Sequence, residues 1–401
     1  MTERYDVAVI GAGAAGMMCA AVAGQRGRAV VLLDHAERLA EKIRISGGGR
    51  CNFTNRDVTA ANFLSNNRDF ARSVFARYGP GDFVALVERH GIAHHEKHRG
   101  QLFCDESSEQ IIAMLVAECD AGGVTWRRPV RIADVSLSDA GDAPAFELAT
   151  TAGPIRAARV VIATGGLSIP KIGASDFAYR MARRFAIPVV EPRPALVPLT
   201  IARWPLAALS GTALEVDVHC DGHGKGRFRE DLLITHRGLS GPAGLQISSY
   251  WMPGRALEVD LAPGLDLAKY LEDARTSSRK SRKSLVNVLS AVLPARLAAH
   301  WVSDVLRIED GRLADMPKAV VAELAGSLRH WRPEPDGTEG YRKAEVTAGG
   351  VDTRALSQRG LEATAVPGLH FIGEAVDMTG WLGGYNFQWA WSSGFVAGQA
   401  V

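Results

Sequence analysis

A glycine-rich turn between two apolar segments near the start of the chain constrains the fold more than any other feature. An apolar run over 5–10 leads into the turn, and a second apolar run over 29–33 ends at Asp34. The residues of the turn are Gly11, Ala12, Gly13, Ala14, Ala15 and Gly16, and a helix is expected to follow them. A strand–helix–strand unit whose strands are apolar throughout is typical of a parallel sheet covered on both faces. The pattern therefore predicts an α/β fold built on a Rossmann-like parallel sheet.

The same residues predict a dinucleotide site. Gly11 permits a tight turn, Gly13 lets the backbone approach a pyrophosphate, and Gly16 permits close packing of the helix on the strand. The first helical residues, Ala14 and Ala15, place a positive helix N-terminus beside the pyrophosphate. Asp34 ends the second strand, where an acidic side chain accepts hydrogen bonds from ribose hydroxyls.

Two later strand ends indicate which dinucleotide is bound. Ala163, Thr164 and Gly165 end an apolar run in the middle of the chain, and Gly373-Glu374 ends another near the C-terminus. Flavoproteins of the two-dinucleotide-binding type place such segments beside the pyrophosphate and ribitol, where Glu374 would accept from a hydroxyl. The helix after Gly383-Gly384 would direct its amides at the flavin edge on which reduction builds negative charge. The sequence has no second Gly-x-Gly-x-x-Gly, so we predict bound FAD, with NAD(P)H as a possible transient donor.

Composition changes divide the chain. Four prolines punctuate residues 188–198, alternating strand patterns follow over 196–262, and helical periodicity follows over 266–330. We predict an FAD domain in two parts, 1–190 and 351–401. Between them we predict a β-rich insertion over 191–265 that returns through 331–350, and a helical insertion over 266–330.

The chain resembles the BaiN-like bacterial flavoproteins, also called the aminoacetone oxidase family. The most specific matching stretches are SGGGRCNFTN, over 46–55, and WLGGYNFQWAWSSG, over 381–394. The resemblance implies a discontinuous FAD domain carrying a β-rich insertion with its own helical insertion, which agrees with the boundaries above. It also implies an oxidoreductase.

The second glycine loop supplies further candidates. We expect Lys42 to neutralise a phosphate, although a solvated lysine explains it nearly as well, and Arg50 to hold pyrophosphate or a substrate carboxylate. Cys51 is expected to be a small buried residue, or alternatively a neighbour of the flavin. We also place Ser46, Gly47, Asn52, Val130, Tyr385 and Asn386 among the FAD-binding residues. No catalytic acid or base is recognisable, and the candidates for catalysis are Arg50, Cys51, Asn52 and Tyr385.

The net charge and the cysteine content indicate which partners and which cellular compartment to expect. The formal net charge is +2, and the five scattered cysteines form no Cys-x-x-Cys, as in reduced cytoplasmic proteins. The uncharged stretch over 7–24 is explained by a strand, a turn and a helix, so no membrane segment is predicted. His94, Glu96 and His98 are interpreted as an exposed loop, and no metal site is predicted. A basic run holds Arg275, Arg279, Lys280, Arg282 and Lys283; a solvated helix start is the simpler interpretation, and a phosphate or RNA contact the alternative.

We therefore expect a cytoplasmic FAD-dependent oxidoreductase that transfers a hydride through flavin N5. The expected donor is NAD(P)H, and the expected substrate is a small or steroid-like carbonyl, enone or amine, with nucleic acid an unlikely partner. Two alternatives stay open, an FAD-dependent RNA-modifying enzyme and a flavin-binding module without turnover.

Overall fold

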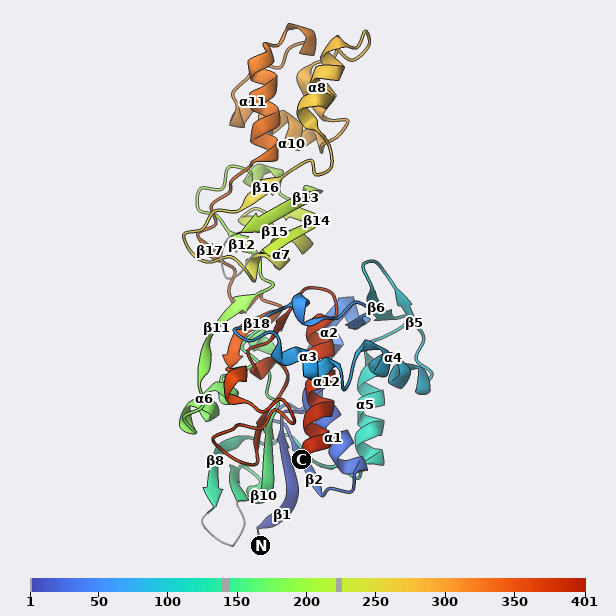
Figure 1. Ribbon diagram of the computed structural model, residues 1–401, viewed down its shortest axis with the longest axis vertical. Helices are drawn as coiled ribbons and strands as arrows, with labels where there is room; N and C mark the ends of the chain where they lie inside the picture. The colour runs from blue at the N-terminus through green and yellow to red at the C-terminus, as the bar shows by residue number, and fades with distance from the viewer. Residues whose placement is uncertain (1, 139–144, 221–225) are drawn as a thin grey trace. The chain divides into compact units, whose positions relative to one another are not determined.

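The computed structural model describes residues 2–138, 145–220 and 226–401 (Figure 1). It divides into two units, the first formed by Met1–Pro194 with Glu345–Val401 and the second by Ala195–Ala344. The five-part division of the chain stays a prediction. No helix among the described residues is both long and apolar enough to cross a membrane.

A seven-stranded sheet forms the centre of the first unit, and the fold class predicted from the sequence is confirmed. The strands run in the order β7-β2-β1-β10-β9-β8, with β19 also paired to β10. Their bounds are β1 (Glu3–Ile10), β2 (Val30–Leu33), β7 (Thr125–Arg127), β8 (Ile132–Ser138), β9 (Ala145–Thr150), β10 (Gly153–Ile162) and β19 (Leu369–Phe371). The pairs of β1 with β2, β1 with β10, β2 with β7 and β10 with β19 are parallel. Because helices cover this sheet, the final residues of β1 and all of β2 are buried, which explains their unbroken apolar sequence.

Helix α1 (Ala14–Gln25) packs on β1 and β2 of this sheet, and α12 (Tyr385–Ala400) lies beside α1 (Figure 1). Small residues allow the close approach, since a Cβ at Gly394 would lie 2.5 Å from the Ala15 carbonyl oxygen. The Arg26 guanidinium donates to the carbonyls of Gly398 and Val401, at 2.9 Å each, and so caps the C-terminal helix. Trp389 and Trp391 of α12 are buried in the core.

Further helices and strands complete the first unit. They are α2 (Glu41–Ile45), β3 (Asn52–Asn55), β4 (Phe63–Leu64), α3 (Phe70–Phe75), α4 (Pro80–Arg89), β5 (His94–Glu96), β6 (Gln101–Cys104), α5 (Glu109–Ala121), α6 (Phe177–Arg184), β11 (Val189–Ala195), β18 (Val346–Val351) and β20 (Thr379–Gly380). Strand β5 corrects one interpretation: His94–Glu96 is paired with β6 and is not an irregular loop, although His95 and Glu96 are exposed.

The second unit joins a β part to a helical part. Its six-stranded sheet runs in the order β16-β13-β14-β15-β12-β17. The strands are β12 (Leu199–Thr200), β13 (Ala213–Cys220), β14 (Gly226–Ile234), β15 (Gly238–Ser240), β16 (Glu258–Asp260) and β17 (Gly337–Thr338), with α7 (Gly241–Ser248) packed on β14. The helical part contains α8 (Leu267–Thr276), α9 (Leu285–Leu289), α10 (Ala295–His300) and α11 (Lys318–Arg329).

A buried histidine in β19 makes stability depend on pH. His370 is 2% exposed, and its Nδ1 lies 2.9 Å from the Gly360 carbonyl oxygen. Its Nε2 is buried without a partner among the described residues. Burial lowers the pKa of His370, although the neighbouring Glu362 carboxylate opposes this shift. The native state therefore holds a neutral imidazole.

We expect the folded state to lose stability as the pH falls below about 6.5, the ordinary pKa of histidine in an unfolded chain. Below that pH His370 binds a proton in the unfolded chain but not in the native state. The free energy of unfolding therefore falls by up to about 1.4 kcal/mol per pH unit. Urea unfolding of the wild type and of His370→Asn across this range measures the effect. Equal pH slopes for the two proteins would show that His370 is not its source.

Candidate dinucleotide-binding site

Four chain segments meet at the carboxyl ends of β1, β2, β10 and β19. The Gly11 amide donates to the Leu33 carbonyl and the Ala163 amide donates to the Ile10 carbonyl, both at 2.8 Å. The Ile372 amide donates to the Ile162 carbonyl at 3.0 Å. Ligands of open parallel sheets bind at this edge. The structure therefore brings together the glycine turn, Asp34, the 163–165 segment and Gly373-Glu374.

The three glycines of the first turn differ in what surrounds them. Gly11 has a φ of +105°, and a Cβ there would lie 2.5 Å from the Ala163 carbonyl oxygen. A Cβ at Gly16 would overlap the Gly11 carbonyl oxygen. Gly13 is different, because no atom lies within 4 Å of the position its Cβ would take. Packing within the chain explains Gly11 and Gly16, whereas Gly13 borders open space.

Helix α1 begins beside this space without a cap. Its N-cap residue is Gly13, no side chain caps it, and its first turn, which includes Ala14 and Ala15, holds no acidic residue. The Thr164 hydroxyl, at the end of β10, is buried without a partner among the described residues. Next to it, Gly165 has a φ of +73° and nothing within 4 Å of its Cβ position. An uncapped helix start, an open glycine and an orphaned hydroxyl fit a dinucleotide pyrophosphate.

Asp34 also stabilises the backbone around it, a role that the sequence did not reveal. Its Oδ2 accepts from the Ala12 amide at 2.6 Å and its Oδ1 from the Ala36 amide at 2.7 Å. The Asp34 carbonyl accepts from the Val130 amide at 2.8 Å, which places buried Val130 beside this strand end. Each carboxylate oxygen keeps a lone pair for a ribose hydroxyl, so the two roles are compatible.

We expect Asp34→Ala to weaken FAD binding and also to lower the stability of the apoprotein. The lost charge-assisted bond to ribose is worth about 1.5–3 kcal/mol, and the Ala12 amide left without an acceptor costs about 1–3 kcal/mol more in folding. FAD titration of the apoprotein, together with urea unfolding, separates the two losses. Wild-type affinity in Asp34→Ala would place the acid away from the ribose.

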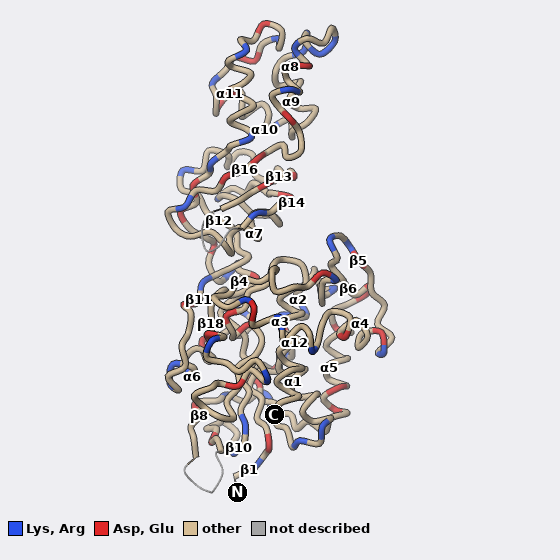
Figure 2. Tube along the Cα trace, in the orientation of Figure 1, with Lys and Arg blue, Asp and Glu red and all other residues tan. Residues whose placement is uncertain are grey.

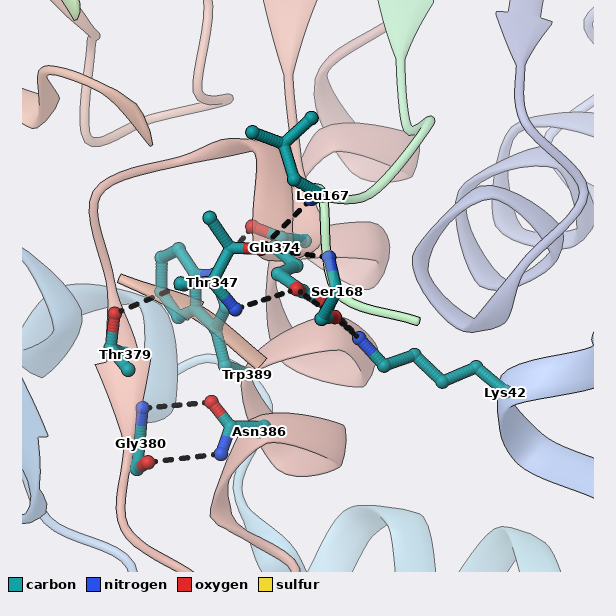
Figure 3. Close-up of polar contacts among 10 residues, drawn as sticks. Lys42, Leu167, Ser168, Thr347, Glu374, Thr379, Gly380, Asn386 and Trp389 are labelled. Atoms are coloured by element: carbon teal, nitrogen blue, oxygen red, sulfur yellow. Dashed lines mark hydrogen bonds and ion pairs between the residues drawn. The ribbon is translucent and has the colours of Figure 1, made fainter. Parts of the chain in front are cut away.

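Glu374 lies in a polar cluster with Lys42, Ser168 and Thr347 (Figure 3). Its Oε2 forms an ion pair with the Lys42 ammonium. Its Oε1 accepts from the Ser168 hydroxyl at 3.0 Å and from the Thr347 amide at 2.9 Å. The Lys42 ammonium also donates to the Ser168 hydroxyl at 2.6 Å. Both charged side chains are partly buried, so three segments far apart in sequence are tied to the end of β19.

Ser168 and Thr347 were missed from the sequence. The Thr347 hydroxyl accepts from the Leu167 amide at 2.8 Å and so holds the loop after β10 (Figure 3). A lone serine and a lone threonine follow no spacing rule that marks them as site residues. The only available signal was that they lie in two further stretches that match the BaiN-like family, over 163–179 and 344–352.

The second glycine loop runs from Ser46 to Asn52. Gly47, Gly48 and Gly49 all have positive φ, and nothing lies within 4 Å of the Cβ positions of the last two. The Arg50 side chain is exposed and makes no hydrogen bond or ion pair within the described part of the chain. Arg50 is therefore available to a ligand.

Cys51 is fully buried beneath this loop. Burial raises the pKa of its thiol far above the ordinary range. The thiolate is the reactive form of cysteine, so Cys51 is suited to packing and not to nucleophilic chemistry.

Amide side chains join the second glycine loop to the start of α12. With its amide oriented to satisfy its neighbours, Asn52 donates to the carbonyls of Thr54 and Leu102 and accepts from the Gly384 amide at 3.2 Å. Asn386 bonds both backbone groups of Gly380, at 2.8 and 2.9 Å (Figure 3). These two side chains hold the backbone around the site.

Three other predicted residues lie in the same region. Gly383 has a φ of +112°, and a Cβ there would press against the Gln101 side chain. The Ser46 hydroxyl donates to the Ile43 carbonyl at 2.7 Å. Tyr385 is buried edge-on to Phe63, with ring centroids 6.4 Å apart. The predicted residues are thus gathered in one unit, and the FAD-binding role of each stays a proposal.

The fold and these strand-end loops define a flavoenzyme of the Rossmann type, and FAD is its cofactor. Residues 5–400 match the family model described as the HI0933-like protein Rossmann domain, and the chain belongs to this family.

Three curated relatives match nearly the whole chain. It is 48% identical to the ribosomal RNA dihydrouridine synthase of Escherichia coli, over 99% of this chain and 98% of the relative. It is 44% identical to the protein of the same name from Haemophilus influenzae, over 100% and 99%. The 3-dehydro-bile acid delta(4,6)-reductase of Clostridium scindens is 28% identical, over 98% of each chain.

Among solved structures, a 3-ketosteroid-delta4-(5alpha)-dehydrogenase from Rhodococcus jostii matches with a TM-score of 0.51. The match covers 99% of this chain and 96% of that chain at 16% identity, which shows a shared fold and nothing more.

These relatives correct two predictions. A small or steroid-like substrate is wrong as the main interpretation, because the relatives at 48% and 44% identity are named for a reaction on ribosomal RNA. The expectation that nucleic acid is an unlikely partner is wrong for the same reason. Among these three curated relatives, the one at 28% identity is named for a reaction on a bile acid.

Proposed function

We propose that this chain is an FAD-dependent enzyme that reduces uridine to dihydrouridine in ribosomal RNA. The observation that carries the proposal is full-length identity of 48% and 44% to two proteins of that name. The resemblance to the BaiN-like flavoproteins agrees with the proposal that the chain is an FAD-dependent reductase. It does not agree with the proposed substrate.

The reduction of uracil and the reduction of an enone, the substrate class predicted from the sequence, use the same chemistry. The C5–C6 double bond of uracil is conjugated with the C4 carbonyl, so it accepts a hydride as an enone does. In the overall reaction NAD(P)H gives up a hydride and becomes NAD(P)⁺, uracil C6 gains the hydride, and C5 gains a proton. FAD, when bound, supplies the hydride-transfer chemistry that connects donor and uracil.

We assign different roles in this reaction to different residues of the chain. The uncapped start of α1, Gly13 and Thr164 would hold the FAD pyrophosphate, and Asp34 would hold the ribose. The Lys42–Glu374 pair would fix the ribitol side of the site. Arg50 would donate to the uracil O4, where negative charge develops as the hydride arrives. These roles rest on the contacts described above and are proposals.

Incubation of the purified protein with NADH or NADPH and unmodified rRNA transcripts tests the function. Nucleoside mass spectrometry should reveal dihydrouridine, formed in proportion to NAD(P)H consumed. Transcripts of transfer RNA and a steroid enone serve as controls. Reduction of the enone without any dihydrouridine in rRNA would contradict the proposal.

A further inference from the structure

The loop between α8 and α9, residues 277–284, concentrates positive charge in the second unit; we call it the basic loop (Figure 2). Arg279, Lys280, Arg282 and Lys283 all have exposed side chains. None of the four has a carboxylate within ion-pair distance among the described residues. The flanking Arg275 is different, because it pairs with Glu272 at 3.3 Å.

The sequence around the basic loop has no acidic residue to neutralise its positive charge. No aspartate or glutamate occurs between residues 274 and 303, a stretch that holds six arginines and lysines. Elsewhere in this unit some exposed arginines are paired, Arg227 with Asp217 at 2.9 Å and Arg332 with Glu258 at 3.1 Å, and those without a carboxylate partner among the described residues are scattered. Clustered like charges repel one another, so an anionic partner would relieve the repulsion.

Backbone contacts hold the loop in a fixed form. The Lys283 carbonyl accepts from the Leu313 amide at 3.0 Å, and the Ser281 carbonyl accepts from the Ala314 amide at 3.1 Å. The Lys280 ammonium lies 5.0 Å from the centroid of the Tyr270 ring. A partner would therefore meet cations that are already arranged, which reduces the entropy lost on binding.

We propose that the basic loop binds the phosphate backbone of ribosomal RNA. This inference rests on the proposed function and adds the surface that holds the substrate. Arginine, lysine and serine side chains are the groups that contact nucleic-acid phosphates, and the loop reads Ser-Ser-Arg-Lys-Ser-Arg-Lys-Ser. It has no apolar or aromatic residue to insert into a bilayer, which favours RNA over an anionic membrane.

The test compares RNA affinity over a range of salt concentrations, with fluorescently labelled rRNA transcript as the probe. The variant R279Q/K280Q/R282Q/K283Q removes the four charges. The control R203Q/R255Q/K269Q/R329Q removes four exposed cations that are scattered over the same unit and have no ion-pair partner among its described residues. The variant R279K/R282K keeps every charge in the loop.

Each phosphate contact contributes about 0.7–0.9 to the slope of log affinity against log salt, so the loop variant should lose about 3 from that slope. At moderate salt its affinity should fall at least about tenfold, while its bound FAD and melting temperature stay those of the wild type. The control and R279K/R282K should keep the wild-type slope.

Unchanged affinity and slope in the loop variant would overturn the inference. Binding of the wild type to phosphatidylglycerol vesicles, lost in the loop variant while its rRNA binding is kept, would overturn it in favour of a membrane surface. Dihydrouridine formation by the wild type is measured separately. If the wild type forms no dihydrouridine, the proposed function is wrong. The role of the loop is decided separately, by the slopes of log affinity against log salt.

Discussion

A Gly13→Val variant will fold as the wild type does and bind no FAD, whereas Gly16→Val will be unstable even without cofactor. The two residues belong to one turn, but only Gly13 has open space around its Cβ position, and its backbone is extended, which valine favours. In the complex that open space would be filled by the pyrophosphate, so we expect FAD affinity to fall at least about a hundredfold.

At Gly16 the new side chain would overlap a backbone oxygen that no rotamer change can move aside. We expect a loss of about 3 kcal/mol or more in the free energy of unfolding. Urea unfolding of the apoproteins and FAD fluorescence titration measure the pair. A Gly13→Val protein that binds FAD normally, or a Gly16→Val protein as stable as wild type, would contradict the assignment of this turn.

Replacement of Arg50 by alanine will slow rRNA reduction by roughly a hundredfold to a thousandfold and leave FAD content unchanged. The guanidinium is exposed and unpaired within the described chain, beside the glycine loop. Loss of one donor to developing negative charge has an effect of this size in other enzymes. Arg50→Lys should recover part of the rate, because it keeps the charge and loses the planar fork.

The matched control is Arg56→Ala, on the same segment, since the Arg56 guanidinium already pairs with Glu96. Single-turnover rates with rRNA transcript, measured beside flavin absorbance, distinguish the two arginines. If Arg50→Ala loses FAD in proportion to activity, Arg50 holds the cofactor and does not act on the uracil.

Local patterns in the sequence were enough to predict the first part of the fold. The apolar runs around Gly11-x-Gly13-x-x-Gly16 and the acid at Asp34 lie within one strand–helix–strand unit, where spacing determines geometry. The cluster of Lys42, Ser168, Thr347 and Glu374 could not be predicted in the same way. Its members come from α2, the loop after β10, β18 and the residues that follow β19, and how these elements come together is not written in any one segment.

The sequence showed the basic run over 275–283 but not which of its charges are neutralised, so a solvated helix start was preferred to an RNA contact. A net charge of +2 over 401 residues does not reveal that four cations of this loop have no carboxylate partner within the part of the chain that the structure describes. Nucleic-acid phosphates respond to the local arrangement, which requires the loop's backbone contacts and the pairing of its neighbours to be known. A steroid-like substrate was preferred in the sequence interpretation, and the proposed uracil substrate accepts a hydride at its C5–C6 bond as a steroid enone does.

Reoxidation of the reduced enzyme by RNA is the sharpest test of the proposed reaction. The holoenzyme is reduced without oxygen by a limiting amount of NAD(P)H and then mixed with unmodified rRNA transcript. We expect the absorbance of oxidised flavin to return, with one dihydrouridine formed for each flavin reoxidised, and rRNA that already carries the modification to have no effect. Return of the absorbance with a steroid enone but not with rRNA would show that rRNA is not the substrate.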